Sequence, residues 1–106
     1  LSSFNTSNVT TMSRMFSDCT GIIRINLTSF NTSKVTDMAK MFYACYKLES
    51  LDLTNFDTIN VKNFEEIFTY TKSISAIHVG NKWTTSNATN TSNMFLGSKV
   101  QQVTNV

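Results

Sequence analysis

Residues 29–42 read SFNTSKVTDMAKMF, and residues 3–16 read almost the same, SFNTSNVTTMSRMF. The pattern returns as NFDTINVKNFEEIF at 55–68 and, one residue late, as KWTTSNATNTSNMF at 82–95. The first three copies begin at positions 3, 29 and 55, a spacing of 26. A fixed period of this size is typical of repeat proteins, whose units bury their apolar sides against one another. We therefore predict a fragment of one solenoid domain, with repeats at 1–26, 27–52 and 53–78 and a degenerate terminal repeat at 79–106.

The composition argues against several classes of function. The net charge is only +2, from nine basic and seven acidic residues that are scattered singly. This gives no electrostatic support for a nucleic-acid partner. No apolar run approaches the about 20 residues that span a bilayer, so we expect no membrane insertion. Two cysteines and one histidine make no metal site, and we expect no cofactor.

One half of each repeat alternates apolar and polar residues. In the best-formed copy, the apolar positions from Leu48 to Phe56 follow the pattern LxxLxLxxF. The pattern recurs one period earlier, and again one period later with one inserted residue. Such alternation suits a short strand with one buried face. We therefore predict a parallel sheet with strands centred near residues 25, 51 and 77.

The other half of each repeat changes to a helical spacing. Its apolar residues sit at i, i+3, i+6, i+7 and i+10, as in Val35, Met38, Met41, Phe42 and Cys45. This spacing places them on one stripe of a helix of about three turns. Ser7 and Ser33 precede two of these segments and are candidate N-caps. We predict helices near residues 9–16, 35–42 and 61–68.

Equivalent residues of successive repeats should stack into ladders. We predict two aromatic ladders, Phe4, Phe30, Phe56 and Trp83 in one and Phe16, Phe42, Phe68 and Phe95 in the other. Full burial of one such side chain contributes about 1.5–3 kcal/mol. A polar ladder should satisfy turn backbone groups and bind nothing. Its members are Asn5, Asn31 and Asp57, beside Thr6, Thr32 and Thr58.

Residues 27–58 carry a resemblance to a known family: LTSFNTSKVTDMAKMFYACYKLESLDLTNFDT. This stretch resembles the BspA-like leucine-rich repeat, whose units run L-x-L-S-x-F-N/D-T-S-x-V-T-D-M-x-x-M-F-x-x-C-x-x-L. Residues 53–78 depart from that pattern at Ile59, Phe64 and Ile67. The resemblance implies an α/β leucine-rich-repeat solenoid, with a short parallel β-sheet on one face and short helices on the other.

The resemblance also implies a function. Better-known relatives attach to extracellular matrix proteins or to other cells, which implies a cell-surface or secreted protein whose signal and anchor lie outside this sequence. The leading hypothesis is a non-enzymatic module that mediates protein binding or adhesion to a host extracellular matrix or cell-surface protein. The alternative is a structural spacer or stalk that projects another domain from the cell surface. Fold-level analogy indicates a class of function and no particular ligand.

Candidate ligand-binding residues are those that vary or protrude while the ladders stay constant. On the strand face these are Arg24, Asn26, Ser50, Asp52 and His78. Three further candidates follow the predicted helices: Tyr43, Tyr46 and Tyr70. Aromatic residues with polar neighbours suit a protein-binding patch, although they would equally seal the edge of a coil.

Asp52 and His78 are the only pair that suggests chemistry. In a parallel sheet in register they would be neighbours, about 5 Å apart. An acid–base pair is one interpretation, and a solvated cross-strand pair is the favoured one. No serine is singled out as a nucleophile, so we expect no catalytic residue and no enzyme.

The cysteines and the N-terminal edge complete the predictions. Cys19 and Cys45 occupy equivalent positions near predicted helix ends, where neighbouring coils should splay apart. We therefore expect two buried free thiols and no disulfide. The first predicted strand lacks a neighbour before Leu1, and open edges of this kind recruit another chain. We expect weak self-association through this edge, head to head.

Overall fold

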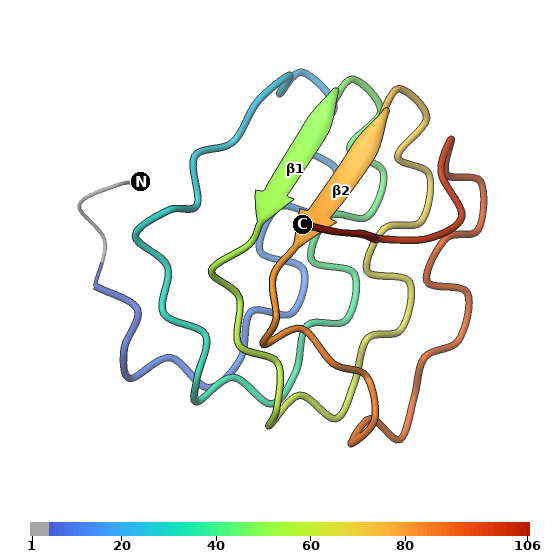
Figure 1. Ribbon diagram of the computed structural model, residues 1–106. Helices are drawn as coiled ribbons and strands as arrows, with labels where there is room; N and C mark the ends of the chain where they lie inside the picture. Colours follow the sequence, from blue (N-terminus) through green and yellow to red (C-terminus); the bar gives the residue numbers. More distant parts are fainter. Residues whose placement is uncertain (1–4) are drawn as a thin grey trace.

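The chain winds into coils that follow one another from the N-terminal to the C-terminal side of the molecule (Figure 1). The computed structural model describes residues 5–106. Leu1 and Phe4, on which two of the predictions above rest, lie outside the described residues. The extents are 31 × 30 × 25 Å, so the coils form a compact body with similar dimensions in all directions.

A small parallel sheet lies on one side of the coils. It consists of β1 (Ser50–Leu53), β2 (Ala76–Val79) and β3 (Thr104–Asn105), in the order β1-β2-β3. The first two strands alternate between the buried and the more exposed side, as their sequences predict. The predicted strands near residues 51 and 77 are therefore confirmed. No strand forms near residue 25, and the repeat boundaries stay a prediction.

Residues 5–106 contain no helix, so the predicted α/β leucine-rich-repeat solenoid with short helices is wrong. The segments expected to be helical, near 9–16, 35–42 and 61–68, run through series of tight turns. We call these the turn segments: 13–18, 39–44, 65–70 and 92–97. Ser7 and Ser33 are therefore no N-caps. Their hydroxyls donate to Asn5 Oδ1 at 2.8 Å and to Asn31 Oδ1 at 2.7 Å.

Left-handed residues explain why turns replace helices. Every fourth residue of a turn segment has positive φ, as at Arg14 (60°) and Asp18 (62°), or Lys40 (57°) and Ala44 (60°). An α-helix of L-residues does not accommodate such a residue. A chain that turns every four residues buries positions i, i+3, i+4 and i+7, which are the positions that an amphipathic helix buries. The two structures therefore share one hydrophobic pattern, and this caused the wrong prediction.

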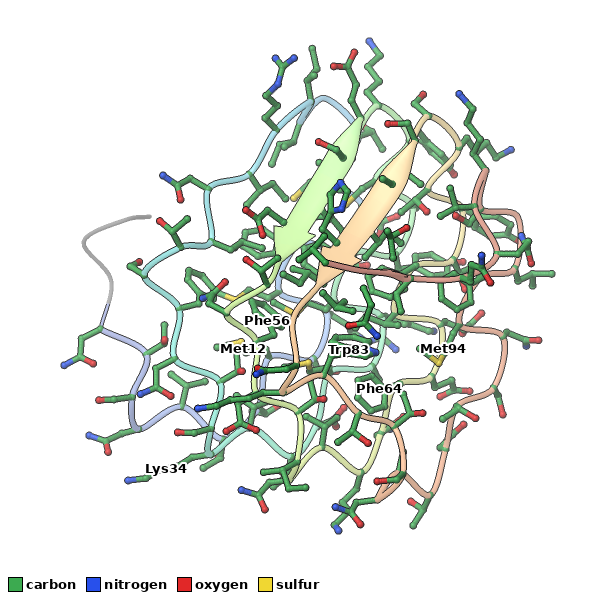
Figure 2. The ribbon with its side chains drawn as sticks, viewed as in Figure 1. Met12, Lys34, Phe56, Phe64, Trp83 and Met94 are labelled. Atoms are coloured by element: carbon green, nitrogen blue, oxygen red, sulfur yellow. The ribbon has the colours of Figure 1, made fainter. Side chains whose placement is uncertain are left out.

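The core is a stack of side chains from successive coils. The predicted ladder of Phe16, Phe42, Phe68 and Phe95 is confirmed, with ring centroids 5.7, 5.9 and 5.5 Å apart along it. Of the other ladder, Phe30 and Phe56 are buried. Trp83 is only partly buried, and its ring lies near that of Phe64 (Figure 2). The two ring centroids are 5.4 Å apart.

The polar ladder joins neighbouring coils as expected. The Thr6 hydroxyl donates to the Asn31 carbonyl (3.2 Å) and accepts the Asn31 N–H (2.7 Å). Thr32 forms the same reciprocal pair with Asp57. Thr58 does so with Thr84. These buried hydroxyls thus form hydrogen bonds with backbone groups that would otherwise be buried without a partner, which confirms their structural role.

Both cysteines are free, as predicted. Cys45 is fully buried and its thiol donates to the Phe16 carbonyl at 3.1 Å, whereas Cys19 is only partly buried. Burial raises the pKa of Cys45 to about 11. The expected splaying of the coils is wrong, because the Asp18 N–H donates to the Tyr43 carbonyl at 2.8 Å beside these residues.

Candidate functional site

The strand face brings together the two residues that suggested chemistry. Asp52 on β1 is the register partner of His78 on β2, which confirms that they are neighbours. Ser50 is placed in the same way beside Ala76. Ser50 and Asp52 are exposed, and Ala76 and His78 are half-buried. These four positions form one strip across β1 and β2, in which Ser50, Asp52 and His78 are polar.

The Asp52 side chain forms hydrogen bonds within the turn that follows β1. Its Oδ1 accepts the Thr54 N–H at 3.1 Å and the Thr54 hydroxyl at 2.7 Å. These hydrogen bonds lower the pKa of Asp52, with a smaller contribution from the charge of His78. Asn26 makes the same two bonds to Thr28, at 3.1 and 2.8 Å. Both side chains therefore stabilise turns at equivalent places, a common role for Asp and Asn.

His78 has one ring nitrogen without a partner. Its Nδ1 is buried and makes no hydrogen bond within the part of the chain that the structure describes. A general base is oriented by hydrogen bonds at both of its ends. Asp52 does not supply that bond, because its contacts go to Thr54.

Arg24 lies away from this pair. Its Nη2 is 3.3 Å from Glu49 Oε1, and the two side chains are 80% and 56% exposed. Such exposed ion pairs contribute about 0–1 kcal/mol. Arg24 and Asn26 lie outside any strand, whereas Ser50, Asp52 and His78 lie on β1 and β2. The five strand-face candidates therefore do not all lie on the sheet. No pocket opens over residues 5–106.

The three candidate tyrosines lie on two adjacent coils. The rings of Tyr43 and Tyr70 are 5.6 Å apart and meet edge to face at 65°. Lys72 Nζ lies 5.7 Å from the ring of Tyr46 and 5.7 Å from that of Tyr70. We call Tyr43, Tyr46, Tyr70, Lys40 and Lys72 the tyrosine cluster. One edge-to-face ring pair joins Tyr43 to Tyr70, and cation–π contacts of Lys72 join Tyr70 to Tyr46, so all three tyrosines are connected.

Lys40 contacts both a tyrosine of the cluster and a glutamate of the next turn segment. Its Nζ lies 5.3 Å from the ring of Tyr43 and 3.5 Å from Glu66 Oε1. The Lys40 and Glu66 side chains are only 25% and 20% exposed, so this ion pair is much less exposed to solvent than that of Arg24 and Glu49. Partial burial, followed by nearby Tyr70 and Glu66, raises the pKa of Tyr43. Like an ordinary tyrosine, Tyr43 is protonated at neutral pH, and its hydroxyl is available as a hydrogen-bond donor.

Gly97 supports the cluster from the next coil. A Cβ atom at this position would lie 2.5 Å from Cδ1 of Tyr70, and the residue has φ +70°. Only glycine meets both demands at little cost. Gly97 and Lys72 were not predicted from the sequence as members of a site. The signal for Gly97 was its rarity, since the chain has only three glycines.

Two classes of site are absent from the part of the chain that the structure describes. Residues 5–106 contain no group of three or more His, Cys, Asp or Glu side chains that would hold a metal ion. Among the same residues no helix is long and apolar enough to cross a membrane.

Comparison with known proteins adds one family. No curated protein and no solved structure matches this chain. The resemblance to BspA-like leucine-rich repeats stays a prediction. A family model described as "Mycoplasma protein of unknown function, DUF285" matches residues 1–105. Because the match spans almost the whole sequence, the chain belongs to the DUF285 family.

Proposed function

We propose that this chain is a non-enzymatic protein-binding module of the cell surface, and that the tyrosine cluster is its binding surface. The observation that carries the proposal is the assembly of Tyr43, Tyr46 and Tyr70 with two lysines across adjacent coils. The cell-surface location, and a host extracellular matrix or cell-surface protein as partner, rest on the resemblance to BspA-like repeats.

The chemistry of the cluster suits a protein partner. Tyrosines bury a large area at a low entropic cost, and they are enriched among the residues that dominate interface energies. Tyr46 is 41% exposed, and Tyr43 and Tyr70 are half-buried, so all three rings are partly accessible. Their neighbours hold them in fixed positions, which reduces the ordering cost of binding.

The two lysines differ in their availability. Lys40 is paired with Glu66, but Lys72 has no ion pair among residues 5–106. Lys72 is exposed and lies over two tyrosine rings. A partner that places a carboxylate at Lys72 and an apolar surface on the rings would use both properties. We therefore expect an acidic surface on the partner, next to an apolar contact.

The test is adhesion of the purified chain to immobilised matrix proteins and to host cells. A double variant, Tyr46→Ala with Lys72→Ala, removes the two exposed side chains of the cluster. Truncation of one dominant interface residue costs about 2 kcal/mol, or about 30-fold in Kd. We expect at least this loss of binding, with an unchanged melting temperature.

The matched control changes the other surface. Substitution of Arg24, Asp52 and His78 by alanine should leave adhesion unchanged, because none of these residues belongs to the tyrosine cluster. Loss of adhesion in this control alone would assign binding to the strand face. Unchanged adhesion in both variants would contradict a binding role and favour the second candidate, a structural spacer. The continuous ladder of hydrogen bonds between coils is the observation that favours the spacer.

A further inference from the structure

Three lysines from successive coils come together where the chain leaves the turn segments. The Lys99 N–H donates to the Thr71 carbonyl at 3.1 Å, so Lys72 and Lys99 lie on hydrogen-bonded neighbouring coils. On the other side, Lys72 Nζ lies 5.7 Å from the ring of Tyr46, the residue that precedes Lys47. We call Lys47, Lys72 and Lys99 the lysine row. The fold thus gathers into one row lysines that are scattered along the sequence.

The lysine row keeps its positive charge. The ion pairs within residues 5–106 involve Arg24 and Lys40, and neither pair includes a member of the row. All three side chains of the row are exposed. Lys47 and Lys72 lie on coils that have a neighbouring coil on each side, so their exposure does not depend on where the sequence begins or ends. The row therefore presents charges that an anionic partner can neutralise.

The geometry of the row suits an extended anion. Hydrogen-bonded coils lie about 4.8 Å apart, so three successive coils spread the lysines over about 10 Å. No pocket opens over the part of the chain that the structure describes, so a small anion finds no enclosed site there. A lysine carries a compact charge without the planar fork that binds an anion through two parallel hydrogen bonds. Compact charges in a line on an open surface favour a linear polyanion that crosses the coils.

We propose that the lysine row binds a linear sulfated polysaccharide, with the three ammonium groups on successive sulfate groups. Binding releases the counterions that such a chain condenses, which gives the association its favourable free energy. The proposal rests on the proposed function for its location, because the extracellular matrix is where such chains occur. It adds a second class of partner, since the tyrosine rings are assigned to a protein. The two partners share Lys72.

A nucleic acid is the other common linear polyanion, and the chain favours it less. The net charge is only +2, so the surface outside the row adds little attraction for a long anion of that charge density. Single strands also stack their bases on free aromatic rings. Tyr46 is the exposed ring beside the row, and Lys72 already lies over it. The surface therefore offers charge without a stacking platform.

The test is the affinity of the purified chain for heparin, a sulfated polysaccharide, measured by calorimetry at several salt concentrations. With about 0.7 counterions released per lysine, the logarithm of the association constant should fall with the logarithm of the salt concentration at a slope of about −2. Binding should then weaken about 16-fold between about 50 and about 200 mM salt. Lys47→Gln with Lys99→Gln keeps the tyrosine cluster intact. This double variant should lose about tenfold in affinity and reduce the slope to about −0.7.

The matched control is Lys34→Gln with Lys62→Gln, which removes the same charge from exposed positions outside the row. It should keep the heparin affinity of the native chain, and both double variants should keep its melting temperature. An equal loss of affinity in the two double variants would overturn the proposal, because the net charge alone would then account for binding. Absence of heparin binding by the native chain at about 50 mM salt would also overturn it.

Two other polyanions test the class of partner. Hyaluronan carries carboxylates at a lower charge density and no sulfate, so it should bind more weakly than heparin; equal binding would overturn the assignment to sulfate. Tighter binding of single-stranded DNA than of heparin would overturn it in favour of a nucleic acid. The outcome is separable from that of the tyrosine cluster, because heparin binding is measured without a protein partner. Heparin binding that depends on Lys47 and Lys99, together with protein adhesion that ignores Tyr46, would contradict the proposed function alone.

Discussion

Arg14→Gly distinguishes a left-handed turn from a helix by the sign of its effect on stability. Arg14 has φ 60° and an exposed side chain. Its N–H donates to Ala39 at 2.9 Å, and its carbonyl accepts from Ser17 at 3.1 Å. Glycine retains both backbone bonds. The substitution therefore changes the conformational energy of one residue and little else.

The magnitude follows from two opposing contributions. A left-handed conformation costs an L-residue about 1–2 kcal/mol, and glycine removes this cost. Glycine also has more freedom in the unfolded chain, which destabilises the folded state by about 0.4–1 kcal/mol. The centres of these two ranges, about 1.5 and about 0.7 kcal/mol, differ by about 0.8 kcal/mol, so we expect a gain of about 0.5–1 kcal/mol in the free energy of unfolding. In a helix the same substitution would cost about 1 kcal/mol.

Thermal unfolding followed by circular dichroism measures this difference. A gain of about 0.5–1 kcal/mol should raise the Tm by roughly 2–6 °C in a domain of this size. The control is Lys62→Gly, since Lys62 is exposed and is not among the left-handed residues. It should lower the Tm, because only the unfolded-state contribution remains. A Tm for Arg14→Gly as low as that of Lys62→Gly would refute the left-handed turn at residue 14.

Three further outcomes follow from burial, space and charge. Met38→Asp should unfold the chain at room temperature or lower its Tm severely, because Met38 is completely buried and the carboxylate would have no partner. Gly97→Ala should cost about 1–2 kcal/mol through its left-handed φ, and should change the near-UV signal of the tyrosines by displacing Tyr70. Maleimide should label Cys19 faster than Cys45 in the native protein at pH 8, because the Cys45 pKa of about 11 keeps that thiol protonated. In urea both thiols should react at similar rates, and recovery of a Cys19–Cys45 disulfide under those conditions would contradict the assignment of free thiols.

The sequence was informative wherever one side chain meets its own equivalent in the next coil. Phe16, Phe42 and Phe68 repeat because each ring packs on the next, so their recurrence alone predicts the ladder. Thr32 and Thr58 repeat for the same reason, since each hydroxyl bonds the following coil. Contacts of this kind need no knowledge of the local backbone. They are the part of the fold that repetition predicts.

The sequence was uninformative about the sign of φ. Arg14, Lys40 and Glu66 all adopt the left-handed region, yet arginine, lysine and glutamate are strong helix formers. Their propensity and the i, i+3, i+4, i+7 pattern both favour the helix, which forms at none of these places. In the last copy, the equivalent positions hold Asn93 and Gly97, the residue types that tolerate positive φ best. The most divergent repeat therefore carried the clearest signal of the true backbone.

The tyrosine cluster shows the same limit at the level of the site. Tyr43 and Tyr70 differ by 27 positions, so a period of 26 places them on adjacent coils, where their rings meet. Lys72 has no equivalent that repeats, and its contact with two rings depends on how the chain leaves segment 65–70. That exit is set by the left-handed Tyr70, which Gly97 makes room for. Gly97 belongs to the fourth copy, yet it leaves space for the side chain of Tyr70 in the third copy. Comparison of equivalent positions in all copies is therefore needed to find such a site from the sequence.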